Sequence, residues 1–313
     1  MKVERASVAK LAAFALLAAL PFLTSSPFYI TVFTEAMIFG IAAMSLDLLL
    51  GYTGLASFGH AAFFGLGAYA TGLVGVHFSA GLPLTLGAAV GVGAFAAFAG
   101  GLLAIRAAGI YFIFLTLALS QMVFAIAFKW RGLTGGDDGL PGIPRPGLWQ
   151  LDSLVNLADN KAFYLLTLVM FALAYLFLRR IVSSSFGSVL IGIRENPGRM
   201  AAVGYNVQVY KIAAFVIAGA VAGLAGGLFA HQFQLVSPDQ VHWQTSAILI
   251  VMVVLGGSGS LVGPALGALL IVLLQNIVST YTQRWPMIMA GLFIVVVMFA
   301  RGGLWGLLRR VRS

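Results

Sequence analysis

The sequence contains no cysteine and very few charged residues. Without cysteine, neither a disulfide nor a thiolate metal site can form. Charged residues make up 9% of the 313 positions, compared with about 25% in a typical soluble protein. Hydrophobic residues make up 61%, and the mean hydropathy is +1.01. A water-soluble core cannot bury so much apolar surface, so we expect an integral membrane protein.

Motifs for nucleotide hydrolysis and metal chemistry are also missing. There is no GxxxxGK[ST] sequence, which excludes a P-loop, and there is no HExxH motif or Cys/His ligand cluster. Residues 256–259 match GxSG and so resemble the nucleophile motif of rhomboid intramembrane proteases, which need a histidine on a later helix. All four histidines precede Ser258. We therefore expect a non-catalytic chain with no bound cofactor and no metal.

Long apolar runs predict an all-α polytopic membrane protein with about ten transmembrane helices. A helix needs about 20 apolar residues to cross the hydrocarbon core, and irregular backbone cannot face lipid. The first run follows a short basic segment, as in a secretory signal, but a second run follows at once, so we interpret it as a retained span. The predicted spans are Val8–Leu23, Phe28–Leu50, Gly59–Phe78, Leu82–Ile105, Gly109–Phe128, Ala162–Leu178, Ile212–Phe233, Thr245–Leu255, Val262–Tyr281 and Met287–Ala300.

The distribution of basic residues predicts the orientation of these spans. Loops on the cytoplasmic side carry an excess of Lys and Arg. With both termini in the cytoplasm, 13 of the 18 basic residues lie on the inner side. The outer side then holds only Lys129, Arg131, Arg145, Lys161 and Arg284. This orientation makes residues 131–161 an extracytoplasmic loop and residues 183–211 a cytoplasmic loop within a single permease-like domain, residues 1–313.

The two long loops differ in composition and in expected role. Residues 131–161 are rich in Gly, Pro and Asp, which is typical of turns, and the loop is a lid, a landing surface for an external protein, or a solvated connector. Residues 183–211 carry Arg194, Glu195, Arg199 and Lys211, and Pro197 and Gly198 interrupt them. They form either a docking loop for a soluble partner or an ordinary basic loop that sets topology.

Two Gly/Ser-rich stretches interrupt apolar runs, GYTGLASFGHAAFFGLGAYATG at 51–72 and VVLGGSGSLVGPALGAL at 253–269. Broken hydrophobic segments at corresponding positions indicate a transport site. Both approach from the same side in the predicted topology, which favours a parallel internal repeat with spans 1–4 matching spans 7–10. Close helix packing is the other explanation for most of these glycines.

Polar groups inside the spans are candidates for function because they are costly in a bilayer. Glu35 lies near the outer end of the second span, and Asp47 near its inner end, where pairing or capping beside Gly51 is the expected role. His60 is the most attractive pathway residue, although a hydrogen-bonded structural histidine is an equal alternative. The candidate pathway residues are Thr53, Ser57, His60, Thr116, Gln121, Ser258 and Ser260.

Several stretches in order along the chain resemble the LivM-type permease subunit of branched-chain amino-acid ABC importers. They are GYTGLASFGHAAFFGLGAY (51–69), LTGGDDGLPGIP (133–144), GIRENPGRMAAVGYNVQVYKIAAFVIAGAVAGLAGGLFA (192–230), SPDQVHWQTSAILIVMVVLGGSGSLVGPALGA (237–268) and FARGGLWGL (299–307). The resemblance covers nearly the whole chain. It is specific to the family but not to the substrate, since relatives are associated with other amino acids, urea and small carboxylates.

This resemblance implies partners and a location in the bacterial inner membrane. A LivH-like second permease would complete the translocation path, two cytoplasmic ATPase subunits would hydrolyse ATP, and a periplasmic binding protein would deliver the substrate. Residues 200–204 resemble the coupling segment of ABC importers, with Met200 where Glu is more usual. The expected ATPase contacts are Arg194, Glu195, Asn196, Pro197, Arg199, Ala201 and Gly204.

An ion- or proton-coupled secondary transporter is the alternative, because such proteins are also built from repeats. That mechanism needs buried ionisable residues as coupling sites. Only Glu35, Asp47 and His60 are available within the predicted spans, and the sequence suggests no partner for any of them.

Overall fold

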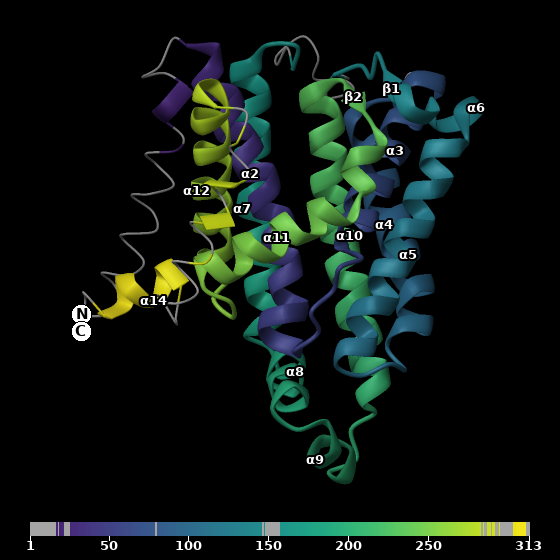
Figure 1. Cartoon of the computed structure of the whole chain (residues 1–313), viewed down its shortest axis with the longest axis vertical. Helices are drawn as coiled ribbons and strands as arrows, with labels where there is room; N and C mark the ends of the chain where they lie inside the picture. The colour runs from purple at the N-terminus through teal and green to yellow at the C-terminus, as the bar shows by residue number, and fades with distance from the viewer. Residues whose placement is uncertain are drawn as a thin grey trace.

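The computed structural model is a bundle of long helices, roughly aligned, with short helical elements at both ends (Figure 1). It describes residues 26–78, 80–145, 157–282 and 303–310, and isolated positions at 17, 19–21, 147, 284, 287, 288, 290, 291 and 294. The elements of the first half are α2 (Pro27–Asp47), the π-helical turn η1 (Leu48–Thr53), α3 (His60–Phe78), α4 (Leu82–Ala104), α5 (Ile110–Lys129), α6 (Arg131–Thr134), the 3-10 turn η2 (Gly136–Asp138) and β1 (Leu140–Pro141).

The second half contains the elements that project from the bundle and a helix pair that packs on α2. They are α7 (Asn160–Val182), α8 (Ser185–Glu195), α9 (Pro197–Ala202), α10 (Val207–Phe233), β2 (Leu235–Val236), the 3-10 turn η4 (Pro238–Val241), α11 (Trp243–Gly256), α12 (Val262–Tyr281) and α14 (Gly303–Arg310). The two strands form one short antiparallel pair, in which Leu140 lies opposite Val236.

Seven helices of the described residues are long and apolar enough to cross a membrane. They correspond to the predicted spans that begin at 28, 59, 82, 109, 162, 212 and 262, although α10 begins at Val207 rather than Ile212. The predicted span at 245–255 is α11, whose 14 residues make a helix about 21 Å long, less than the hydrocarbon thickness of about 30 Å. The predicted spans at 8–23 and 287–300 lie almost wholly outside the described residues. The polytopic all-α fold is confirmed, while the total of ten spans and the repeat stay predictions.

Helix α2 is the centre of the bundle and is buried along most of its length. It packs against α7, α10, α11 and α12. Its small residues permit this crowding: a β-carbon added at Gly40 would lie 2.9 Å from the ring of Phe171 on α7. The end of this central helix, at Asp47, is therefore enclosed by protein.

Helices α3, α4 and α10 form a second tightly packed group through glycine contacts. Gly93 of α4 faces Gly219 and Gly223 of α10, and the backbones approach so closely that an added β-carbon would collide with a carbonyl oxygen. Gly67 of α3 meets Gly223 in the same way. Small residues at such positions let membrane helices pack by close backbone contact. Close packing therefore accounts for these glycines, including Gly67, which lies in the first Gly/Ser-rich stretch.

The two ends of the bundle carry different accessory structures (Figure 1). Helices α8 and α9 project beyond the long helices at one end, which we call the α9 end. The strands β1 and β2, with α6, lie at the other end, which we call the β1–β2 end. Between them, α11 crosses the bundle obliquely at mid-height, so the segment that precedes it returns from the β1–β2 end into the interior.

Candidate functional site

The α8–α9 pair is the most exposed part of the described chain at the α9 end. Helix α9 has no buried residue, and Val203 just beyond it is 70% exposed. A six-residue helix is too short to be stable by itself in water. Local caps hold it instead: the Asn196 side chain accepts the backbone N–H of Arg199 at 2.9 Å, and Pro197 occupies the first helical position.

The Met200 side chain packs α9 against α8. An added β-carbon at Gly192 would lie 2.7 Å from the Met200 sulfur, so the glycine provides the flat surface on which this side chain rests. Gly204 ends the segment with φ +97°, a conformation that favours glycine. The residue that departs from the expected coupling pattern, Met200, therefore packs α9 onto α8 and leaves the neighbouring residues exposed.

All seven predicted contact residues of this segment lie on the exposed surface. They are Arg194, Glu195, Asn196, Pro197, Arg199, Ala201 and Gly204. Arg194 differs from the others because its guanidinium also turns toward the bundle and donates a hydrogen bond to the carbonyl oxygen of Gly51. One face of the pair is thus open to a partner, while α8 packs on the membrane helices and Arg194 adds a hydrogen bond to them.

Asp47, at the end of α2, joins the two Gly/Ser-rich stretches. One carboxylate oxygen accepts the N–H of Gly259 at 2.7 Å, and the other accepts the N–H groups of Ser260 and Leu261 at 3.2 and 3.1 Å. Three successive backbone N–H groups make a favourable environment for an anion. The expected capping role of Asp47 near Gly51 is confirmed, and the structure shows that the capped segment is the turn before α12.

Gly51 lies between Asp47 and this turn. A β-carbon at Gly51 would collide with the Asp47 carboxylate and would also lie against the backbone of Gly259. Gly54, with φ +76°, packs on the Arg194 side chain, whose Cγ would be 3.1 Å from an added β-carbon. Only glycine fits at these two contacts, because backbone and charged side chains meet there without intervening atoms.

The chain between η1 and α3 breaks the helical path inside the bundle. Here the Phe58 N–H donates to the Thr116 hydroxyl on α5 at 3.1 Å, and the Gly59 N–H donates to the Ser57 hydroxyl. Ser57 and His60 are fully buried. Non-helical backbone at membrane depth is tolerated where protein covers it and supplies such partners.

His60 begins α3 and contacts the central helix. The Ser45 hydroxyl donates to the Ala42 carbonyl and lies 2.7 Å from His60 Nε2, so we assign the imidazole proton to that nitrogen. The other ring nitrogen, Nδ1, is buried and has no hydrogen-bond partner among the described residues. His60 is therefore held to Ser45 through Nε2, and its Nδ1 is an acceptor without a partner among the described residues.

Five of the seven predicted pathway residues fall into two groups in the structure. Ser57, His60 and Thr116 meet around the break in the interior. Ser258 and Ser260 lie instead in the turn between α11 and α12, where Ser258 is exposed and the Ser260 hydroxyl donates to the Gly257 carbonyl. Thr53 bonds within its own helical turn, to the Leu48 carbonyl, and Gln121 lies on α5 beyond Thr116.

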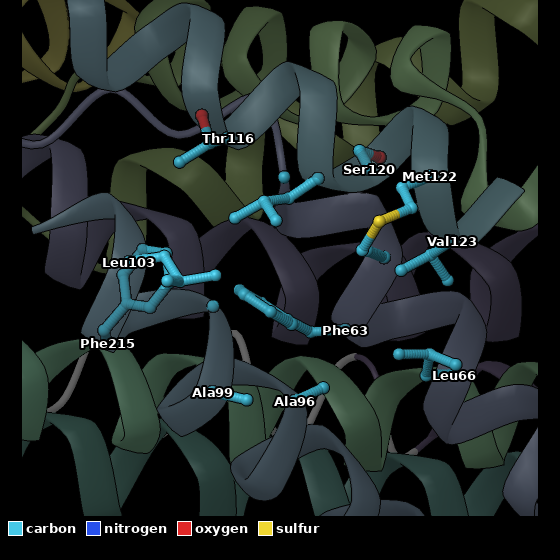
Figure 2. A pocket seen from close by; sticks show the side chains of 14 residues that line it. Phe63, Leu66, Ala96, Ala99, Leu103, Thr116, Ser120, Met122, Val123 and Phe215 are labelled. Carbon is cyan, nitrogen blue, oxygen red and sulfur yellow. The ribbon is translucent and has the colours of Figure 1, made fainter.

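A cavity of about 220 Å³ adjoins the interior break, between α3, α4, α5 and α10. Figure 2 shows Phe63, Leu66, Ala96 and Met122 around it. The hydroxyls of Thr116 and Ser120 are bonded to the carbonyls of Ile113 and Val241, so the wall presents mainly carbon atoms. Such a lining suits an aliphatic group and offers little to an ion.

Two serines near the break were missed as site residues in the sequence analysis. Ser246 of α11 accepts the N–H of Ala61 at 2.8 Å, and Ser45 of α2 contacts His60. Ser45 is a single small polar residue within an apolar run, and Ser246 follows Gln244 and Thr245 at the start of one, so the sequence gives only a weak signal for either. Their roles depend on which helices are neighbours.

At the β1–β2 end, Arg145 anchors the long loop to the bundle. Its guanidinium donates to the carbonyls of His231 and Gln232 at 3.0 and 2.9 Å and to the Asn160 side chain at 2.7 Å. It also lies over the Phe163 ring at 5.0 Å. Burial lowers the pKa of Arg145 below its usual value. This part of the loop is a packed cap.

A bundle of membrane-length helices with a break in its interior and a helical pair projecting from one end is typical of a membrane transport protein. Residues 28–300 match the family described as "Branched-chain amino acid transport system / permease component", so the chain belongs to that family. It is a permease subunit of an ABC importer and a multi-pass protein of the inner membrane. Such permeases act with ATPase subunits, a second permease and a substrate-binding protein.

Individual relatives agree with this assignment. The chain is 28% identical over 290 residues to the "High-affinity branched-chain amino acid transport system permease protein LivM" of Salmonella typhimurium, covering 87% of this chain and 68% of the relative. It is 27% identical over 168 residues to a probable LivM of Methanocaldococcus jannaschii, covering 53% and 47%. It is 28% identical over 250 residues to the "Autoinducer 2 import system permease protein LsrC" of Salmonella paratyphi B, covering 76% and 68%. No solved structure matches the chain significantly.

Proposed function

We propose that this chain pairs with a LivH-like second permease to form the translocation path for branched-chain or similar amino acids. Two cytoplasmic ATPase subunits power the cycle, and a periplasmic binding protein delivers the substrate. The family match and the names of the LivM relatives support the substrate class. The mainly carbon wall of the cavity beside the interior break supports an aliphatic substrate.

The observation that carries the coupling mechanism is the α8–α9 pair. Its outer surface is exposed, no residue of α9 is fully buried, and Arg194 connects the pair to Gly51 in the bundle. ATP closes the ATPase dimer, which pushes on this pair and shifts the equilibrium between inward- and outward-open arrangements. The energy comes from the different affinity of the partners for the two states.

The orientation follows from this coupling. The α9 end lies in the cytoplasm, as do both chain termini, and the β1–β2 end faces the binding protein. The distribution of basic residues supports this arrangement. The full membrane domain has about ten spans, and the two Gly/Ser-rich stretches belong to corresponding positions of a parallel repeat. Their contact through Asp47 and Gly51 agrees with a shared role at the inner end of the path.

The pathway residues of the interior are Ser57, His60, Thr116 and Gln121, with Thr53 near them and Ser258 and Ser260 at the cytoplasmic end. The unused acceptor of His60, Nδ1, is available to a polar group of the substrate or to water. An ion-coupled transporter is not favoured, since among the described residues the Glu35 carboxylate is hydrogen-bonded to a neutral amide, that of Asn276, and Asp47 is occupied by backbone N–H groups.

Reconstituted transport tests this proposal. The chain is placed in liposomes with candidate permease, ATPase and binding-protein partners, and uptake of labelled leucine is measured with ATP or with a proton or sodium gradient. We expect uptake that requires ATP and every partner. Uptake by this chain alone, driven by a gradient, would refute the importer assignment, and ATP-driven uptake of another solute in preference to leucine would refute the substrate.

A further inference from the structure

We infer that Asp47 is a positioning residue through which the α8–α9 pair controls the turn at residues 257–261, so that ATP-driven movement of α8 reaches the ends of α11 and α12. This inference rests on the proposed coupling role of α8–α9 and adds the route by which the movement enters the membrane domain. Asp47 touches neither the substrate nor the ATPases in this scheme. It acts through the turn that it holds.

The turn at 257–261 depends on Asp47 for its shape. Gly257 and Gly259 have φ values of +105° and +77°, and Leu261, which has a side chain, has φ +55°. A non-glycine residue in this left-handed region is strained and persists only where its surroundings hold it. The N–H of Leu261 is bound by Asp47, as are those of Gly259 and Ser260. Removing this acceptor leaves the turn free to relax.

The turn at 257–261 is also where the chain reverses between helices α11 and α12. Helix α11 ends at Gly256 and α12 begins at Val262, so both ends move with it. Gly303 at the start of α14 packs on Gly257, and α11 in turn reaches the interior break through the Ser246–Ala61 hydrogen bond. A shift of the turn is therefore transmitted to the predicted pathway residues.

Arg194 links α8 to Asp47 and to the turn at residues 257–261. Its guanidinium bonds the Gly51 carbonyl, its stem packs on Gly54, and its charge interacts with that of Asp47. Gly51 in turn contacts both the Asp47 carboxylate and Gly259. Buried carboxylates are costly unless bonded and balanced by opposite charge. Withdrawal of Arg194 by a movement of α8 leaves Asp47 less balanced and favours a new arrangement of the turn.

Spin-label distances in the assembled transporter separate this inference from the proposed function. The chain has no cysteine, so labels on this subunit attach only to the cysteines that are introduced. Exposed labelling sites are Ser188 on α8, Ser258 in the turn and, as a reference at the far end of α3, His77. Each distance, 188–77 and 258–77, is measured with and without ATP in the wild-type background, in Asp47→Asn and in Thr34→Val. Thr34 is the matched control because it is a buried, hydrogen-bonded residue of the same helix, far from the turn.

In the wild type and in Thr34→Val, ATP should change both distances. In Asp47→Asn, the 188–77 distance should still change and the 258–77 change should be lost. An undiminished 258–77 change in Asp47→Asn would overturn the inference and leave the docking role intact. An unchanged 188–77 distance in the wild type would overturn both.

The second readout is the number of ATP molecules hydrolysed for each substrate molecule taken up. Asp47→Asn should raise this number on the order of fivefold or more, a typical coupling between sites, while Asp47→Glu should partly restore it. Arg194→Gln is the second variant, at an exposed position of α8. If both residues act on one route, the double variant should be no worse than the poorer single variant. Additive losses, in an Arg194→Gln variant whose 188–77 distance still responds to ATP, would show independent roles and overturn the inference.

Discussion

The guanidinium of Arg194 on α8 is hydrogen-bonded to the backbone carbonyl of Gly51, which lies 143 residues earlier in the chain. The contact joins the α8–α9 pair to η1, the π-helical turn that follows the central helix α2. Because the acceptor is a backbone atom, a substitution at position 51 can crowd this contact but cannot remove it.

Replacing Ala201 with Glu should abolish coupled transport without affecting folding. Ala201 is exposed on α9, so the larger side chain meets no other part of this chain. In a complex it would bury an unpaired carboxylate at the ATPase contact, at a cost of more than about 1.4 kcal/mol, or tenfold in affinity. Co-purification of the ATPases and ATP-driven uptake measure the effect. Ser183→Glu, an exposed position before α8, is the control and should behave as wild type. Normal uptake by Ala201→Glu would refute the docking role.

Gly51→Ala should destabilise the protein, whereas Gly87→Ala should not. The added methyl group at position 51 collides with the Asp47 carboxylate and Gly259, and such overpacking costs about 1–3 kcal/mol. Gly87 on α4 has open space around it, and alanine there gains helix propensity of up to about 1 kcal/mol. Thermal unfolding in detergent compares the two variants with the wild type. Equal melting temperatures for both variants would contradict the close contact at Gly51.

Arg145→Ala should loosen the cap at the β1–β2 end. The guanidinium bonds two carbonyls at the end of α10 and the side chain of Asn160, and a hydrogen bond to a charged group contributes about 1.5–3 kcal/mol. Faster hydrogen exchange at residues 140–143 and 234–236 would report the loss. Lys161→Ala removes an exposed charge from the same end and should leave exchange unchanged. Protection equal to wild type in Arg145→Ala would show that the strands hold the cap without it.

Filling the cavity should distinguish a substrate path from a packing defect. Ala96 lines the cavity, and phenylalanine at this position would occupy much of its volume of about 220 Å³. If aliphatic substrates pass here, Ala96→Phe should reduce leucine uptake strongly while ATP hydrolysis by the assembled complex continues. Val92→Phe places the same ring on an exposed part of α4 outside the lining and is the control. Equal uptake by the two variants would place the path elsewhere.

Much of the site depends on contacts that no local pattern in the chain predicts. Ser258 and Ser260 shared a Gly/Ser-rich signature with Ser57, yet they lie in a different part of the protein, at the turn that Asp47 caps. Ser246 lies in a stretch that resembles the family, but nothing local marks it as a site residue, and it accepts the N–H of Ala61 beside the interior break. Met200 looked like a departure from the coupling pattern, and it proves to be the residue that packs α9 on α8.

Hydropathy by itself determined that this chain is a polytopic helical membrane protein, because the need to satisfy backbone hydrogen bonds in lipid acts on each segment separately. The same local reasoning identified the polar segment at 183–211, which the structure shows as α8, α9 and the start of α10, and the glycine-rich breaks. Only the tertiary structure decided which breaks meet, that Asp47 binds the backbone at 259–261 and that Arg194 reaches Gly51. Those contacts depend on the way glycine-lined helices far apart in sequence approach one another, which is a property of the whole bundle.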